Sequence, residues 1–172
     1  MTKYAALLRG VNVGGRIIKM AELKICLEKA GLEDVETLLQ SGNVIFKSNK
    51  NELQLKIQIQ KTLADTFNYP AKVWILSLDK LRKIVEANPY AEASKEYHQY
   101  VVFIENELEV ELLVKAGVEL GEEVSAGQGV VYWKVQKGQT LKNPFAKLLT
   151  KSQYREFNTN RNINTLQKIV RK

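Results

Sequence analysis

Two arginines and a pair of glycines lie close together near the start of the sequence. The stretch LLRGVNVGGRIIKM contains Arg9 and Arg16, and between them the chain bends at Gly14 and Gly15 before reaching Lys19. Glycines allow the backbone to approach a ligand closely, and a loop that enters a helix presents unpaired N–H groups to an oxyanion. Cationic side chains add charge-assisted hydrogen bonds. These residue types predict a candidate anion site, and a tight strand-to-helix connection is the alternative interpretation.

The spacing of this loop excludes two well-known phosphate motifs. No Gly-Lys-Ser or Gly-Lys-Thr follows the glycines, so the loop is not a Walker A motif. The segment RGVNVGG also lacks the three glycines of the dinucleotide-binding fingerprint. The sequence therefore predicts an anion site without identifying a nucleotide.

A second polar cluster, NTNRNINT, surrounds Arg161 at residues 158–165. Asn and Thr side chains satisfy backbone groups at turns and helix starts, so a cap for the last helix explains this composition. Turn geometry likewise explains Ser41 and Asn43, which lie between two apolar runs.

No catalytic or metal-binding arrangement is evident in the sequence. The single Cys26 and the single His98 cannot form a zinc site by themselves. We expect Cys26 to be a buried packing residue and His98 to be structural or exposed at a strand start, and a catalytic Cys–His pair is the alternative. No metal site is predicted, the identity of any cofactor stays unknown, and the question of catalysis stays open.

Hydrophobic periodicity predicts a strand, helix, strand, strand, helix, strand order over residues 1–77. Glu52 to Phe67 is ambiguous, because LQLKIQIQ alternates like a strand whereas Leu55, Ile59 and Leu63 form a helical row. Asn49 and Glu52 resemble a capping box, which favours a helix. This element order is that of a ferredoxin-like domain. The other elements are expected at Lys3–Arg9, Lys19–Ala30, Val35–Leu39, Val44–Lys47 and Lys72–Leu76.

The second half repeats the pattern. A helix that Ser77 caps and a polar loop form a connector over residues 78–97, and residues 98–172 follow it with a terminal helix at Thr165–Lys172. We expect Asn143-Pro144 to open a helix and Tyr154–Thr159 to supply the last strand. The predicted fold class is α+β, with two tandem ferredoxin-like halves and antiparallel sheets. The remaining elements are expected at His98–Glu105, Leu108–Ala116, Glu123–Ser125 and Gly129–Gln136.

The chain carries a formal net charge of +7 that is unevenly distributed. Residues 1–76 balance at +4, residues 77–135 at −5 and residues 136–172 at +8. A segregated basic end can hold a phosphate-bearing partner or keep a protein soluble. No apolar run approaches the roughly 18 residues that cross a bilayer, and the first residues lack signal-peptide features, so we expect a cytoplasmic protein without a membrane partner.

Several motifs together resemble the DUF1697 family of uncharacterised bacterial proteins. These are ALLRGVNVGGRIIKMAEL, QSGNVIF, the dipeptide Asn88-Pro89 and RNINT, and they run in order from residue 4 to about residue 169. The resemblance implies a ferredoxin-like α+β fold and no established activity. Ile163 departs from the family pattern, in which a tryptophan commonly separates the two asparagines, so any stacking by that tryptophan is lost here. The resemblance marks as family-pattern positions Arg9, Gly10, Asn12, Gly14, Gly15, Ser41, Gly42, Asn43, Arg161, Asn162, Asn164 and Thr165.

Polar residues at motif positions in three distant loops lead to one hypothesis. The Arg9–Gly15 loop and the Arg161–Thr165 segment meet to bind a phosphate, a nucleotide or a carboxylate-bearing metabolite, with the Ser41–Asn43 turn adjacent. The ligand-binding residues are then Arg9, Asn12, Gly14, Gly15, Ser41, Asn43, Arg161, Asn162 and Asn164.

Two alternatives stay open. One is a nucleic-acid-binding module, because a four-stranded sheet of this type is also the RRM platform and the net charge is positive. Its candidate aromatics are Tyr4, Phe46, Tyr132 and Trp133, although the RNP1 pattern is not matched. The other is a homodimeric interaction protein without catalysis, which a mass measurement in solution would reveal.

Overall fold

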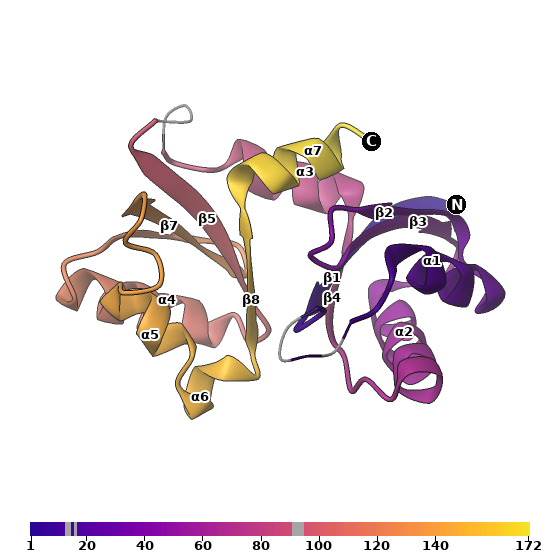
Figure 1. The fold of residues 1–172 in the computed structure, drawn as a ribbon. Coiled ribbons are helices and arrows are strands. Elements are labelled where there is room, and N and C mark those ends of the chain that lie inside the picture. The colour runs from indigo at the N-terminus through magenta and orange to yellow at the C-terminus, as the bar shows by residue number, and fades with distance from the viewer. Residues whose placement is uncertain (13–14, 16, 91–94) are drawn as a thin grey trace. The chain divides into compact units, whose positions relative to one another are not determined.

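The computed structural model describes residues 1–12, 15, 17–90 and 95–172. The chain divides into two compact units (Figure 1). The first unit comprises Met1–Leu81 with Lys172, and the second comprises Arg82–Arg171. Gly14, Arg16 and residues 91–94 lie outside the described residues.

The first unit contains a four-stranded antiparallel sheet with the strand order β2-β3-β1-β4. The predicted order of elements is confirmed, and the ambiguous segment Glu52–Phe67 is a helix. Its elements are β1 Thr2–Arg9, α1 Met20–Lys29, β2 Glu33–Leu38, β3 Asn43–Ser48, α2 Glu52–Phe67 and β4 Lys72–Ser77.

The start of α2 differs from the prediction in its capping residue. Asn51, not Asn49, accepts a hydrogen bond from the backbone N–H of Gln54 at 2.9 Å. The side chain of Gln54 accepts in return from the backbone N–H of Asn51 at 3.1 Å. The reciprocal pair is a capping box in which Gln replaces the expected Glu, so the sequence pattern was placed two residues too early.

Helices α1 and α2 pack on one face of the first sheet. Leu23 and Leu27 of α1 and Leu55, Ile59 and Leu63 of α2 are buried together with alternate residues of β1, β3 and β4. The i, i+4 row therefore outweighs the strand-like alternation, because only the helix brings these side chains to one face.

Strand β2 is an edge strand and carries an irregularity. Its register with β3 shifts between Glu33 and Glu36, and Asp34 has a positive φ of 51°. The carboxylate of Asp34 pairs with Nζ of Lys47 at 2.7 Å. This is a bulged, acidic outer edge.

The second unit repeats the strand arrangement, with the order β6-β7-β5-β8 and antiparallel pairing throughout. Helix α3 begins in the first unit and ends in the second. The elements from α3 onward are α3 Leu78–Glu86, β5 Tyr97–Ile104, α4 Leu108–Glu119, β6 Glu123–Gly127, β7 Val130–Gln136, α5 Pro144–Leu149, α6 Ser152–Arg155, β8 Asn158–Asn162 and α7 Ile163–Val170.

Two predicted helix starts are confirmed. The hydroxyl of Ser77 accepts from the N–H of Lys80 at 3.3 Å at the start of α3. Asn143 caps α5 by accepting from the N–H groups of Phe145 and Ala146, with Pro144 in the first turn. Both follow from side chains that satisfy orphan N–H groups.

The last strand was predicted in the wrong place. The sequence favoured Tyr154–Thr159, whereas Ser152–Arg155 forms the short helix α6 and the strand begins at Asn158. Polar NTNRN forms a strand because it pairs with β5, not because of its own propensity. Arg161 thus lies in β8 and not in a capping loop.

The molecule is an α+β protein with two four-stranded antiparallel sheets. Within the part of the chain that the structure describes, no helix has the length and apolarity needed to cross a membrane.

Candidate functional site

Two of the predicted site segments lie together in the first unit. The N–H of Leu8 donates to the carbonyl of Gly42 at 2.8 Å, which joins the end of β1 to the β2–β3 turn. Asn12 bridges the loop and the turn, because its Nδ2 donates to the carbonyl of Gln40 at 3.2 Å and its Oδ1 accepts from the N–H of Ile18 at 2.7 Å. The end of β1 and Asn12 are therefore hydrogen-bonded to the turn between β2 and β3.

Glycine is required at the contact between these segments. Gly42 has a φ of 72°, and a Cβ added there would lie 2.9 Å from the Cβ of Leu8. Asn12 also has a positive φ, of 58°, which asparagine tolerates better than most residues. These family-pattern positions are thus explained by backbone conformation as well as by any ligand.

The side chain of Asn43 is used within the protein. It is fully buried, and its Nδ2 donates to the carbonyl of Leu38 at 3.2 Å and to Oγ of Ser41 at 2.8 Å. Both amide hydrogens are therefore engaged in holding the turn. Arg9 ends β1 opposite Lys72 and is partly exposed.

In the second unit, Arg161 lies in β8 opposite Val101 and is only 9% exposed. Its Nη1 donates to Oγ1 of Thr159 at 3.0 Å and to the carbonyl of Asn160 at 2.8 Å. These contacts hold the buried guanidinium beside its own strand. Its Nη1 already donates two hydrogen bonds within β8.

A pocket of about 160 Å³ lies at the start of α7. Asn162 ends β8 and caps α7, because its Oδ1 accepts from the N–H of Asn164 at 2.9 Å. Two predicted site residues, Asn162 and Asn164, therefore line the pocket at the N-terminal turn of α7. It is lined by Tyr97, His98, Gln99, Lys137, Asn162, Ile163 and Asn164.

Two residues of this pocket were not predicted as site residues. Nδ1 of His98 lies 3.5 Å from the amide nitrogen of Asn162, which donates to it when that ring nitrogen carries no proton. Lys137 is held beside the start of β5 by the hydrogen bond from its N–H to the carbonyl of Glu96, at 2.9 Å. The pocket lining includes this cation and no carboxylate.

A family model described as protein of unknown function (DUF1697) matches residues 1–132. The chain belongs to the DUF1697 family. The matched part includes the Arg9 loop and the hairpin turn, whereas the Arg161–Thr165 segment lies beyond it. No curated protein is significantly similar in sequence.

A solved structure resembles this DUF1697 protein over nearly its whole length. It is the conserved bacterial protein SP0830 from Streptococcus pneumoniae, with 28% sequence identity and a TM-score of 0.80. The similarity covers 99% of this chain and 97% of the other. The two-sheet arrangement is thus shared with a bacterial relative.

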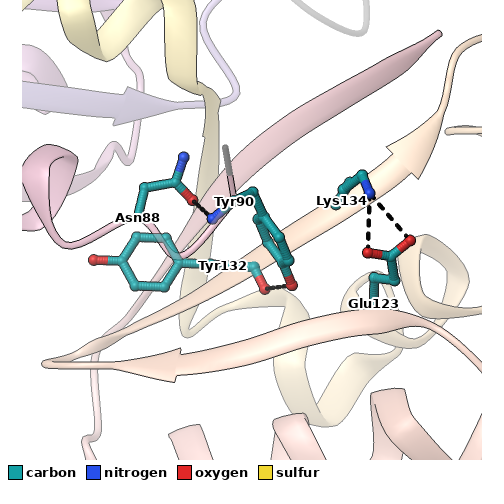
Figure 2. A network of polar contacts seen from close by, with 5 residues as sticks. All are labelled: Asn88, Tyr90, Glu123, Tyr132 and Lys134. Carbon is teal, nitrogen blue, oxygen red and sulfur yellow. Dashed lines mark hydrogen bonds and ion pairs between the residues drawn. The ribbon is translucent and has the colours of Figure 1, made fainter. Parts of the chain in front are cut away.

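The dipeptide Asn88-Pro89 of the DUF1697 chain supports the pocket wall. Nδ2 of Asn88 donates to Oε1 of Gln99 at 2.7 Å, and Gln99 lines the pocket. Oδ1 of Asn88 accepts from the N–H of Tyr90 at 3.4 Å (Figure 2). Asn88 therefore links the segment after α3 to β5.

Tyr90 of the DUF1697 chain connects the segment after α3 to β7. Its hydroxyl donates to the carbonyl of Tyr132 at 3.4 Å (Figure 2). Burial, with a smaller effect of the Glu123 carboxylate, raises the pKa of Tyr90 to about 12. Glu123 pairs with Lys134 at 3.1 Å.

The aromatic residues that suggested an RRM-like surface are buried. Tyr4, Phe46, Tyr132 and Trp133 all belong to the hydrophobic interior. Trp133 contacts Phe145 edge to face, and its Nε1 donates to Glu122 at 3.3 Å. A base cannot stack on rings that the protein already covers, so these four aromatics are core residues and form no RRM-like stacking platform.

Cys26 is buried, as predicted. Its Sγ donates to Oγ1 of Thr66 at 3.3 Å, and both residues line an open groove of about 640 Å³ between α1 and α2. His98 belongs to the other unit. Among the described residues, no group of three or more His, Cys, Asp or Glu side chains is placed to hold a metal ion.

Proposed function

We propose that this protein binds a small anionic ligand, a phosphate or a carboxylate, in the pocket at the start of α7. The observation that carries the proposal is the lining of that pocket, which combines Lys137 with the first turn of α7 and contains no carboxylate. The N-terminal turn of a helix favours negative charge, and a lysine ammonium adds a charge-assisted contact.

The size of the pocket restricts the ligand. Pockets for drug-sized molecules occupy roughly 300–1,000 Å³, whereas this one has about 160 Å³. It suits one phosphate, one carboxylate or the anionic end of a larger molecule. A whole nucleotide would have to leave most of its surface outside.

Inorganic phosphate tests the proposal directly. We expect saturable amide shifts at Asn162, Asn164 and Lys137 in a titration followed by NMR at constant ionic strength. A Lys137→Gln substitution should weaken phosphate binding by roughly tenfold or more, because a hydrogen bond to a charged group is lost. Acetate in the same titration separates a carboxylate preference from a phosphate preference.

Lys134→Gln is the matched control. Lys134 lies on β7, three positions before Lys137, but it pairs with Glu123 and does not line the pocket. Its substitution should leave phosphate affinity unchanged. Equal losses in both variants, or no saturable shifts in the unmodified protein, would show that no specific anion site exists here.

The sequence also predicts that the Arg9–Gly15 loop and Arg161 contribute to ligand binding. We propose this contribution on the basis of their family-pattern positions and their basic side chains. Arg9→Ala should then lower phosphate affinity, and an unchanged affinity would restrict the site to the pocket residues. Homodimerisation and a cytoplasmic location stay predictions.

We also propose that each unit is a ferredoxin-like half. The support is the strand, helix, strand, strand, helix, strand order of the first unit, which the second unit repeats with two short helices, α5 and α6, before its last strand. The sheet orders β2-β3-β1-β4 and β6-β7-β5-β8 also correspond. In the first unit, both helices pack on one face of the sheet.

A further inference from the structure

Four exposed basic side chains follow one another along the segment from the loop after β7 to α6. They are Lys142, Lys147, Lys151 and Arg155, which we call the basic surface. None of the four pairs with a carboxylate among the described residues. Several exposed lysines of the first unit differ in this respect, since Lys19, Lys24, Lys61 and Lys80 each contact an acidic side chain.

The backbone beneath the basic surface is held firmly at several points. Asn143 caps α5, and its Nδ2 donates to both carboxylate oxygens of Glu122 at 2.8 and 2.7 Å. Phe145 and Leu149 of α5 are buried. Nδ2 of Asn158 donates to the carbonyls of Leu149 and Tyr154. A fixed backbone lowers the ordering cost when a partner binds.

The residues between the cations suit a phosphate backbone. Ser152 and Gln153 are exposed and offer hydrogen-bond donors. Lysine, arginine, serine, threonine and glutamine side chains make most of the contacts to phosphate oxygens in nucleic-acid complexes. Phe157, at the end of the segment, is 42% exposed and offers a ring face.

A membrane surface fits these observations less well. Helices that lie in a lipid interface have a long apolar face opposite a basic one. Here α5 has 6 residues and α6 has 4, and the inward side of α5 is already buried in the protein. Leu141, although 91% exposed, is a single apolar side chain.

We propose that the basic surface binds the sugar–phosphate backbone of a nucleic acid without sequence preference. This site is separate from the anion pocket, whose cation is Lys137, and it differs from the buried aromatic face that an RRM would use. The interaction is electrostatic, so it releases counterions and weakens as salt is added.

Fluorescence anisotropy with labelled single-stranded and duplex oligonucleotides of mixed sequence tests the proposal. The variant carries Lys142→Gln, Lys147→Gln, Lys151→Gln and Arg155→Gln. If all four cations contact phosphates, the slope of log affinity against log salt should become less steep by about 3. In the unmodified protein, amide shifts caused by the oligonucleotide should fall at residues 139–157.

A charge-matched control separates binding at the basic surface from a general attraction between a positively charged protein and the nucleic acid. Changing Lys19, Lys24, Lys61 and Lys80 to glutamine lowers the formal net charge by the same amount, so affinity and salt slope should both be retained. Equal losses in the two variants, or the absence of salt-dependent binding in the unmodified protein, would overturn the proposal. Tighter binding to phosphatidylserine vesicles than to either oligonucleotide would also overturn it.

Two further measurements distinguish a failure of the nucleic-acid proposal from a failure of the anion-pocket proposal. Lys137→Gln should leave oligonucleotide binding unchanged, and the basic-surface variant should retain phosphate shifts at Asn162 and Asn164. Either proposal can therefore fail without the other. Thermal melting of the basic-surface variant checks that it is folded, which we expect because the four side chains are exposed.

Discussion

Tyr90 and Tyr132 use their polar groups in different ways. The hydroxyl of Tyr132 donates to the carbonyl of Ile84 at 2.6 Å in a buried setting, and the carbonyl of Tyr132 accepts from Tyr90. Burial raises the pKa of both phenols, that of Tyr90 to about 12. The segment after α3 is thus held to β7 by groups that must keep their protons.

This arrangement predicts a loss of stability at alkaline pH. Between pH 10 and about 12, Tyr90 ionises in the unfolded chain but keeps its proton in the folded one. The free energy of unfolding therefore contains a Tyr90 contribution below pH 10 that is lost as pH rises towards 12. Urea denaturation from pH 9 upward should show a shallower decline for Tyr90→Phe than for the unmodified protein. Identical declines would contradict the prediction.

Gly42 gives a second prediction for a single residue. The left-handed backbone alone should lower the free energy of unfolding of the Gly42→Ala variant by roughly 1–2 kcal/mol. The contact of the new Cβ with Leu8 adds to this loss. Gly31→Ala is the control, since Gly31 has a φ of 87° and open space around its Cβ position. Urea denaturation should show the larger loss for Gly42→Ala, and equal losses would mean that the turn adjusts.

At the level of elements, the sequence pattern and the structure differ in the residue that caps α2. Asn51→Ala should cost about 0.5–2 kcal/mol of stability, because α2 loses its N-terminal cap. Asn49→Ala, at the residue that the sequence pattern favoured, should change stability by less than about 0.5 kcal/mol. Denaturant midpoints of the two variants check this, and a larger effect of Asn49→Ala would contradict the assignment.

Elements with a strong apolar pattern were predicted from sequence, whereas β8 was predicted too early in the chain. Strand β5 has buried Val101, Val102 and Phe103, which identify it by composition. Asn158–Asn162 has no such pattern, and it becomes a strand only through its pairing with β5. Tertiary contact thus overrides local preference in the segment that carries two of the predicted site residues.

The pocket was missed for a related reason. His98 and Asn162 are separated by 64 positions in the chain, and the pairing of Tyr100 with Asn162 brings them together. No local spacing signals such a contact. Asn162 and Asn164 could be found as motif positions, whereas Lys137 could have been found only as one member of a basic C-terminal segment.

At the level of the molecule, the two units share an order of elements but little sequence. In each sheet a central strand is paired on both sides, β1 in the first and β5 in the second. Both strands consist largely of buried residues. The common arrangement therefore rests on burial pattern and topology.

Native-state hydrogen exchange should reflect this arrangement. The slowest amides are expected in β1 and β5, because opening them disrupts two neighbouring strands and the core. Amides of the edge strands β2 and β6 should exchange faster. Slower exchange in β2 than in β1 would contradict the prediction.

The shifted register and acidic side chains of β2 have a consequence for crowded solutions. An incoming chain that tried to prolong the first sheet along β2 would meet an irregular backbone at Asp34 and the ion pairs that Asp34 and Glu36 form with lysines. Natural sheets discourage fibril growth by these means. On that side, we expect the first unit to resist polymerisation when its concentration is high.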